Sequence, residues 1–398
     1  MQFIDLAAQQ SRIKQKLDDN IQRVLAHGQY VMGPEVLELE KQLANYVGTK
    51  YAIGCASGTD ALLLALMSYG IGPGDAIFTT PFTFIATAEV ISLLGATPVF
   101  VDIEPQTFNL DPAALKLAVQ AVQSNNPSGY PVPHCGARDS HKSRALRPKG
   151  VIAVDLFGLP ADYDRINSIA VKNDLFVIAD AAQSFGAEYK GRKACARGHV
   201  ACTSFFPAKP LGCYGDGGMC FTDNGGLAET IHSLRVHGQG HHKYDHVRIG
   251  LNGRLDTLQA AILLAKFEIF AEEVKLRQQV AQRYTELLAP SLRAPSIPEG
   301  YLSVWGQYSI LAESETYRSA LQQKLKEAEI PTAIYYPKPL HLQTAFASLG
   351  YRKGNFPVSE DCATRIFSLP MHPYLKAEDQ ERIALILQYQ FVRGELHD

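Results

Sequence analysis

The chain has 398 residues, of which 46% are hydrophobic and 20% charged, with a formal net charge of -2 at pH 7. This composition is ordinary for a globular protein with a large core, and the charge argues against nucleic acid or an acidic membrane as a partner. The seven cysteines are odd in number and lack paired zinc spacing, which favours free thiols. With neither a signal peptide nor a membrane-spanning apolar run evident, we expect a cytoplasmic protein.

The first part of the chain alternates helices with short apolar strands. Helices are predicted over 13–25 and 34–44, and then strand 51–54, helix 61–67, strand 76–79, helix 86–94, strand 98–102 and helix 112–122. Later strands are predicted over 150–157, 175–180 and 218–222, followed by a helix over 227–236. This rhythm predicts an α/β fold with a mostly parallel sheet and helices on both faces.

Residues 123–149 interrupt the rhythm. They are rich in Ser, Asn, Pro and Gly and then in basic residues, which predicts an exposed inserted loop. His134, Cys135 and His141 have no matched second pair, so we do not predict a metal site there. Four histidines within 237–246 are interleaved with glycines, and we interpret that segment as a flexible loop rather than a zinc site.

The last third of the chain predicts a second, smaller domain. A long helix over 255–288 leads into strand 307–312, helix 318–328, strand 332–336 and helices 360–366 and 377–388. We therefore divide the chain into a large domain, residues 1–250, and a small α+β domain with its linking helix, residues 251–398.

Lys209 lies between Pro207 and Pro210 and just before a run of glycines, so no helix runs through it and its backbone is stiff. The buried strand upstream ends at Asp180, and parallel sheets bind ligands beyond the carboxyl ends of their strands. A lysine that can form a Schiff base and a carboxylate that can face a pyridinium nitrogen are the pair that pyridoxal 5′-phosphate requires. Gln183 follows Asp180 by three residues.

A phosphate site is predicted at residues 55–60, where a strand turns into a helix. The sequence Cys-Ala-Ser-Gly-Thr-Asp has free N–H groups at a helix start, which favour an anion. The same residues are also an ordinary helix cap.

These motifs resemble the nucleotide-sugar aminotransferases of the DegT/DnrJ/StrS family. The resemblance is carried by residues 57–61, 82–87, 180–186, 204–212 and 250–256. It implies a fold-type-I fold, like that of aspartate aminotransferase. It also implies that Lys209 and Asp180 are catalytic. The cofactor would be held by Gly58, Thr59, Phe84, Asp180, Gln183, Ser204, Lys209 and, from a second subunit, Asn252. The substrate residues would be Arg254, Tyr336 and His341.

Within the family the chain is most similar to enzymes that aminate a UDP-linked 3-keto-N-acetylglucosaminuronate. The resemblance implies L-glutamate as donor, a homodimer with shared sites and a role in surface polysaccharide such as O-antigen. A different sugar, with a 4-keto group or a dTDP or GDP carrier, stays open. So do a desulfurase and a non-catalytic regulatory protein of the same fold. Sugar 3-dehydratases of this fold carry histidine in place of the lysine, so Lys209 argues against that chemistry.

Overall fold

The computed structural model describes residues 1–133, 145–288 and 292–388. Its centre is a seven-stranded sheet in the order β1-β9-β8-β5-β4-β2-β3. All neighbouring pairs are parallel except the two that β9 makes with β8 and β1. The strands are β1 Tyr51–Cys55, β2 Asp75–Thr79, β3 Thr97–Phe100, β4 Arg147–Val154, β5 Phe176–Asp180, β8 Val200–Ser204 and β9 Gly218–Thr222.

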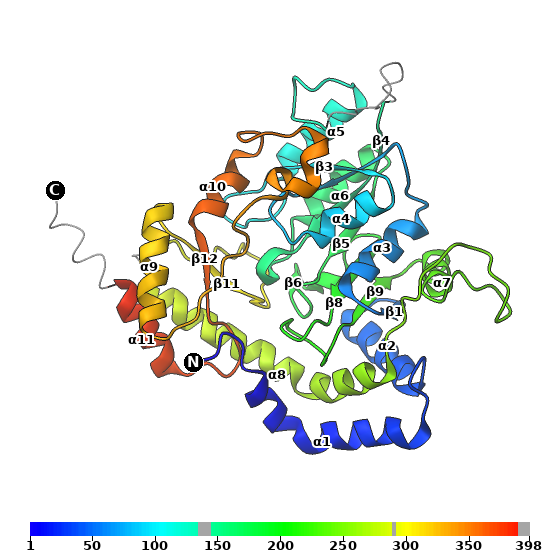
Figure 1. Cartoon of the computed structure of the whole chain (residues 1–398), viewed down its shortest axis with the longest axis horizontal. Coiled ribbons are helices and arrows are strands. Elements are labelled where there is room, and N and C mark those ends of the chain that lie inside the picture. Colours follow the sequence, from blue (N-terminus) through cyan, green and yellow to red (C-terminus); the bar gives the residue numbers. More distant parts are fainter. Residues whose placement is uncertain (134–144, 289–291, 389–398) are drawn as a thin grey trace.

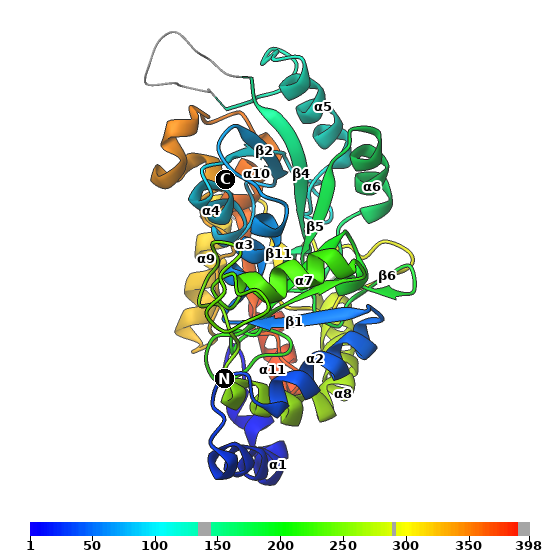
Figure 2. The ribbon, with the colours of Figure 1, turned by 90° about the vertical axis from the view of Figure 1, so that its right-hand side faces the viewer.

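Helices cover both faces of this sheet, as Figure 2 shows for α3 and α4 on one side of β4 and β5 and for α5 and α6 on the other. The strands supply alternate side chains to the two layers. In β5, Val177 and Ala179 pack with α5 and α6, whereas Ile178 packs with α3, α4 and α7. Asp180 follows Ile178 by two residues and therefore faces the α3–α4 side, which is where its partner is found. The covering helices are α2 Pro34–Val47, α3 Gly58–Ser68, α4 Ala86–Leu93, α5 Pro112–Gln123, α6 Tyr163–Lys172 and α7 Gly225–Leu234.

A second hydrophobic core lies beyond the sheet, on the left of Figure 1. The long helix α8, Thr257–Leu288, packs on α1, Leu6–His27, and on α2 at its first half, and on α11 at its second half. The two-stranded antiparallel sheet of this unit joins β11 to β12. The remaining elements of the unit are β11 Tyr308–Leu311, α9 Glu315–Glu327, α10 Pro357–Arg365, β12 Ile366–Leu369 and α11 Ala377–Gln388. Since Met371 also donates its N–H to the Phe3 carbonyl, the N-terminus touches this unit, and a boundary at residue 250 stays a prediction.

Short elements complete the described chain. A three-stranded sheet pairs β6 with β7 and with β10. Short 3-10 helices follow β4 and β7, and two more lie in the segment between α9 and α10. Their bounds are β6 Glu188–Tyr189, β7 Arg192–Lys193, β10 Tyr301–Leu302, η1 Leu156–Gly158, η2 Ala194–Ala196, η3 Leu340–Leu342 and η4 Thr344–Leu349.

The predicted α/β fold is confirmed, and two elements of the small unit are corrected. Residues 332–336 do not form a strand; they contribute a single bridge between Ala333 and Ser368. Residues 366–369, whose first residue was predicted to end a helix, are instead the strand that pairs with β11. All four residues of this strand are buried, and a short buried run of this kind fits a strand or the end of a helix equally well.

The inserted loop is shorter than predicted and is anchored at its start. Helix α5 ends at Gln123 and β4 begins at Arg147. Tyr130 reaches back to the sheet, where its hydroxyl accepts the Asp102 N–H at 3.0 Å, and it packs beside the buried Phe356. His134, Cys135 and His141 lie outside the described residues. No helix in the described ranges is long and apolar enough to cross a membrane.

Candidate active site

Asp180 ends β5 with its carboxylate held by two donors. Its Oδ2 accepts the Thr87 hydroxyl at 2.7 Å and its Oδ1 accepts the Ala182 N–H at 3.2 Å. Burial raises the pKa of this carboxyl, and both hydrogen bonds and the nearby Lys209 oppose the rise. Asp180 is 5% exposed and makes no salt bridge within 4.0 Å to any described residue. The arrangement favours a carboxylate that can hold a cationic group of a ligand.

Lys209 lies on a loop between β8 and β9 whose backbone is tied at both ends. The Phe205 N–H donates to the Gly217 carbonyl at 2.7 Å, and the Lys209 N–H donates to the Phe206 carbonyl at 2.8 Å. The ammonium group has no hydrogen-bond acceptor among the described residues. Burial lowers its pKa, and Asp180 opposes the effect. A half-buried amine of lowered pKa, fixed in direction, is suited to act as a nucleophile.

The predicted phosphate turn lies directly against the end of β8. Ser57 caps α3 by accepting the Asp60 N–H at 3.0 Å. The amides of Gly58 and Thr59, which begin the helix, have no acceptor within the described chain. A Cβ at Gly58 would lie 2.6 Å from the Ser204 Cβ. Only glycine at position 58 therefore allows the turn to lie this close to the Ser204 side chain. Two free N–H groups, a helix dipole and a serine hydroxyl thus meet at one place.

Gln183 and two aromatic residues line the neighbouring part of the site. Gln183 accepts the Phe157 N–H with Oε1 at 2.7 Å, and its amide nitrogen donates to the Tyr336 hydroxyl at 3.2 Å. The Tyr336 ring lies 6.4 Å, centroid to centroid, from the ring of Phe84, which is 55% exposed. Phe84 comes three residues before Thr87, which binds Asp180, and its exposed ring is available to stack on a flat ligand.

His341 is buried beside Glu360 in this structure, and its contact with the substrate stays a prediction. Its side chain is 0% exposed, and its Nε2 lies 2.9 Å from the Glu360 carboxylate. The ring packs edge-on against Phe356. Burial lowers the pKa of His341, and the hydrogen bond to Glu360 opposes the effect. These contacts anchor the loop that carries Tyr336. The sequence alone does not show whether a loop histidine has such a structural role or contacts the substrate.

Asn252 and Arg254 lie on a segment that adds to the edge of the sheet. The Ala56 N–H donates to the Gly253 carbonyl at 3.1 Å, and Arg254 forms a bridge with Cys55. Arg254 donates from Nε and Nη2 to the Asn252 Oδ1 at 3.0 and 2.6 Å. The amide oxygen of Asn252 therefore already accepts hydrogen bonds from Arg254. The amide nitrogen of Asn252 stays available to donate, and the Asn252 side chain is exposed.

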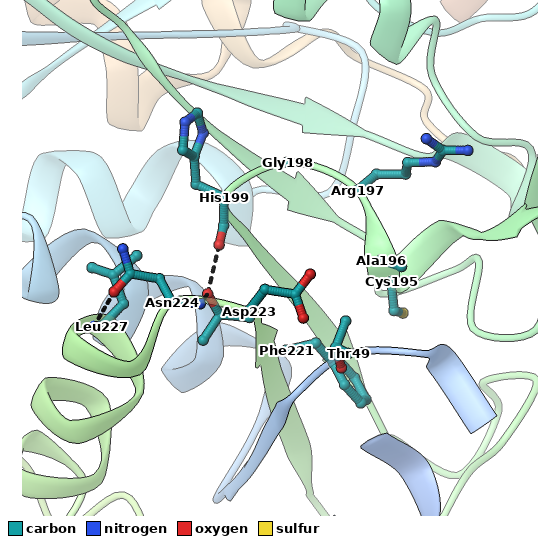
Figure 3. A pocket seen from close by; sticks show the side chains of 11 residues that line it. Thr49, Cys195, Ala196, Arg197, Gly198, His199, Phe221, Asp223, Asn224 and Leu227 are labelled. Atoms are coloured by element: carbon teal, nitrogen blue, oxygen red, sulfur yellow. Dashed lines mark hydrogen bonds between the residues drawn. The ribbon is translucent and has the colours of Figure 1, made fainter. Parts of the chain in front are cut away.

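A separate hollow of about 370 Å³ lies at the ends of β8 and β9 that are away from Ser204 and Gly218. It is lined by His199, which precedes β8, and by Thr222 and Asp223 at the end of β9 (Figure 3). The His199 carbonyl accepts the Thr222 hydroxyl at 2.8 Å, and Asp223 accepts the Lys50 N–H at 2.8 Å. Since Ser204 and Gly218 pair at the opposite end, this hollow is remote from Lys209.

Known proteins resemble the chain along nearly its whole length. The DegT/DnrJ/EryC1/StrS aminotransferase family matches residues 11–388. The chain belongs to this family. A Pseudomonas aeruginosa UDP-2-acetamido-2-deoxy-3-oxo-D-glucuronate aminotransferase is 50% identical, over 94% of this chain and 96% of the relative. A Geobacillus stearothermophilus pleiotropic regulatory protein is 41% identical over 96% of each chain. A solved Brucella abortus aminotransferase of the family is 48% identical and superposes with a TM-score of 0.91, covering 98% of this chain and 99% of that one.

As an aminotransferase of this family, the chain uses pyridoxal 5′-phosphate, and three features of its residues fit that cofactor. The free amides of Gly58 and Thr59 beside Ser204 suit a phosphate. Asp180 is a buried carboxylate that lacks a salt bridge within the described ranges. The Lys209 amine makes no hydrogen bond to any described residue and lies near the Asp180 carboxylate.

The sequence prediction missed Thr87 and Asp155, which support the aminotransferase site. Thr87 binds Asp180 directly. Asp155 is fully buried and accepts hydrogen bonds from the Tyr163 and Ser184 hydroxyls at 2.7 and 2.8 Å. Burial raises its pKa to about 7. Thr87 belongs to a motif that the sequence showed, but only the fold brings it to Asp180.

Proposed function

We propose that this aminotransferase transfers an amino group from L-glutamate to a UDP-linked 3-keto sugar, with UDP-2-acetamido-2-deoxy-3-oxo-glucuronate as the best candidate. The observation that carries the proposal is the pair of Lys209 and Asp180 at the carboxyl ends of the strands, in a chain 50% identical to an enzyme named for that substrate. The product would serve surface polysaccharide synthesis, such as that of O-antigen.

Each residue of the site has a role that follows from its contacts. Gly58, Thr59 and Ser204 would hold the phosphate through the free amides and the hydroxyl. Phe84 would stack on the pyridine ring, and Gln183 would donate to the phenolic oxygen. When bound, the cofactor supplies an electron sink for the carbanion that forms as the amino group is moved. Asp180, kept in place by Thr87, would hold the proton on the pyridine nitrogen.

Lys209 would move a proton between two carbons. One is the substrate carbon that carries the amino group, and the other is the cofactor carbon bonded to that group. The lowered pKa of Lys209 supports this, because a general base must be neutral when it accepts the proton. Tyr336, whose hydroxyl accepts a hydrogen bond from the Gln183 amide nitrogen at 3.2 Å, would contact the sugar.

The working unit would be a homodimer in which each chain completes the other's site. Asn252 would donate its amide nitrogen to the partner's phosphate, because Arg254 occupies its oxygen. Exposed apolar side chains surround this segment: Tyr30 and Val31 precede α2, and Val247 and Ile249 lie on the loop after α7. Ile249 is 90% exposed. Such a patch supports an interface between two copies.

The loop after α7, residues 237–250, projects from the body in Figure 1. It folds back on itself through a bridge between Gln239 and His246. Among the described residues, no three or more His, Cys, Asp or Glu side chains are grouped so that they could hold a metal ion. The exposed apolar side chains of Val247 and Ile249 support a role for this loop in the interface.

A cytoplasmic location is part of the proposal. The six described cysteines are free and buried, as expected in a reducing compartment. The burial of Cys195, Cys202 and Cys213 also disfavours a desulfurase, whose sulfur carrier must be accessible.

The test loads the purified protein with pyridoxamine phosphate and offers it a panel of nucleotide ketosugars. The panel contains UDP-linked 3-keto sugars with and without the uronate carboxylate, and dTDP- and GDP-linked 4-keto sugars. Conversion of the UDP-linked 3-keto uronate with the highest kcat/KM supports the proposal. Preference for a 4-keto sugar would move the chain to another substrate class. Failure to aminate any sugar would favour the regulatory alternative, which the Geobacillus relative's name raises.

Arg254 would also be tested on that panel. If its guanidinium binds a uronate carboxylate, Arg254→Gln raises KM for the uronate and leaves KM for the neutral sugar unchanged. If it only orients Asn252, both substrates lose activity together and cofactor affinity falls.

A further inference from the structure

The edge of the central sheet is closed by a buried ion pair behind the phosphate turn. Strand β1 is an edge strand, and its outward N–H and C=O groups need partners. At Gly54 the N–H donates to Glu40 Oε1 at 2.8 Å, and the carbonyl accepts from Arg235 Nη1 at 2.6 Å. Glu40 and Arg235 are themselves 2.5 Å apart. The two side chains are 7% and 2% exposed as residues, so water does not screen the pair.

The same arginine is tied to the segment that carries Asn252. Its carbonyl accepts the Gly253 N–H at 3.0 Å, and the Gly253 carbonyl accepts the Ala56 N–H at 3.1 Å. Val236, the next residue, forms a bridge with Asn252. The Glu40 and Arg235 side chains therefore pair with the β1 edge at Gly54, and the segment around Gly253 pairs with the next residues, Cys55 and Ala56.

Among the described residues, Glu40 and Arg235 form a salt bridge only with each other. His232, on the last turn of α7, lies 3.0 Å from Arg235 Nη2 through its Nδ1. Burial and the adjacent arginine lower the pKa of His232, so the imidazole stays neutral and acts as an acceptor. Glu40 from α2 is the anion that offsets the arginine charge.

We propose that Glu40 and Arg235 are positioning residues that fix two half-sites at once: the chain's own phosphate turn at 57–59 and the Asn252 segment offered to the partner. The inference rests on the shared site of the proposed function. A buried, hydrogen-bonded ion pair is rigid only while both partners are present. Loss of either side chain removes a partner of Gly54, just before Ser57. It also loosens the backbone of residue 235, whose carbonyl holds the Gly253 N–H.

The first test measures affinity for pyridoxal 5′-phosphate by absorbance titration of Arg235→Lys and Glu40→Gln. We expect the dissociation constant to rise about tenfold or more, the loss expected for charge-assisted hydrogen bonds. Arg277→Lys is the matched control, because Arg277 is also buried, at 5% exposed, but donates to the Trp305 and Met371 carbonyls in the small unit. The control is expected to lower the melting temperature without changing cofactor affinity.

If both single variants fail to fold, Glu40→Gln combined with Arg235→Gln replaces the pair by two neutral amides and removes the unpaired charge. This double variant is expected to melt closer to wild type and still to bind the cofactor weakly. Wild-type affinity in any folded variant of the pair would overturn the inference.

The second test separates the two half-sites with mixed dimers purified through two tags. One chain carries Lys209→Ala, so the visible band of lysine-bound cofactor reports only the other chain's lysine. In one arm Arg235→Lys lies on the lysine-bearing chain, and in the second arm it lies on the Lys209→Ala chain. We expect weakened cofactor binding in both arms. Normal binding in the second arm would show that the pair does not position the Asn252 segment.

A third mixed dimer distinguishes failure of this inference from failure of the proposed function. It combines a wild-type chain with a chain that carries both Lys209→Ala and Asn252→Ala. Weakened binding here establishes that the segment crosses between subunits. If binding is normal here, the shared site itself is refuted, and with it the second half of the inference.

Discussion

Lys266 on α8 is predicted to weaken the fold near neutral pH. It is 0% exposed, and its amine has no hydrogen-bond partner among the described residues. The amine lies 4.2 Å from the centroid of the Tyr214 ring. Burial lowers its pKa from 10.5 to about 8, against the opposing influence of Glu273 and Cys213. A shift of this size means that the protonated amine costs the folded state roughly 3 kcal/mol.

The sign of the pH effect follows from proton binding. Between pH 8 and 10.5 the unfolded chain binds the Lys266 proton and the folded chain does not, so the cost is complete below pH 8 and vanishes above 10.5. The contact with Tyr214 returns up to about 2 kcal/mol to the charged form. Lys266→Met is therefore expected to be more stable than wild type at pH 7 by between roughly 1 and 3 kcal/mol. The gain should disappear as the pH rises to 10.5.

The assay is urea unfolding of both proteins from pH 7 to 10.5. Thiols and phenols titrate in both proteins, so their effect cancels in the difference between the two free energies of unfolding. Lys275→Met, at an exposed position of the same helix, is the control and should show no such trend. A difference between Lys266→Met and wild type that does not change with pH would refute the reasoning.

Three further predictions concern the site and the inserted loop. Asp180→Asn should fold and bind the cofactor but lose about a hundredfold in kcat, or roughly 3 kcal/mol; turnover within a few-fold of wild type would contradict its role. Gly58→Ala should bind the cofactor at least about tenfold more weakly in an absorbance titration, because its Cβ would lie 2.6 Å from Ser204, whereas Gly129→Ala, with open space around it, should not. Replacing residues 134–144 by a short Gly/Ser linker should leave the melting temperature and cofactor binding unchanged; an insoluble product would show that the loop is structural.

Much of the large unit could be predicted because each strand there is a short, continuous apolar run between helices. The strand that ends at Asp180 and the strand over 218–222 are found where the pattern places them. The small unit was harder, since residues 332–336 have the composition of a strand but lie between Pro331 and Pro337 and make one bridge. Which of two similar segments pairs with β11 is decided by tertiary packing, not by local preference.

In the site, too, local motifs could be found from the sequence, whereas contacts between distant residues could not. Lys209, Asp180 and the turn at Gly58 could be singled out as candidates because each stands in a distinctive local motif. His341 could not be assigned, because a histidine in a loop gives no sign of whether Glu360 will bury it. The clamp of Glu40 and Arg235 joins residues 195 positions apart, and only the fold brings them together.

The central claim is that Lys209 binds the cofactor. The direct measurement is reduction of the holoenzyme with sodium borohydride, followed by digestion and mass spectrometry of the peptides. The phosphopyridoxyl group is expected on Lys209, with none on the same peptide from Lys209→Ala protein. A modified lysine elsewhere in the wild-type chain, or a Lys209→Ala enzyme that still aminates a ketosugar, would contradict the account.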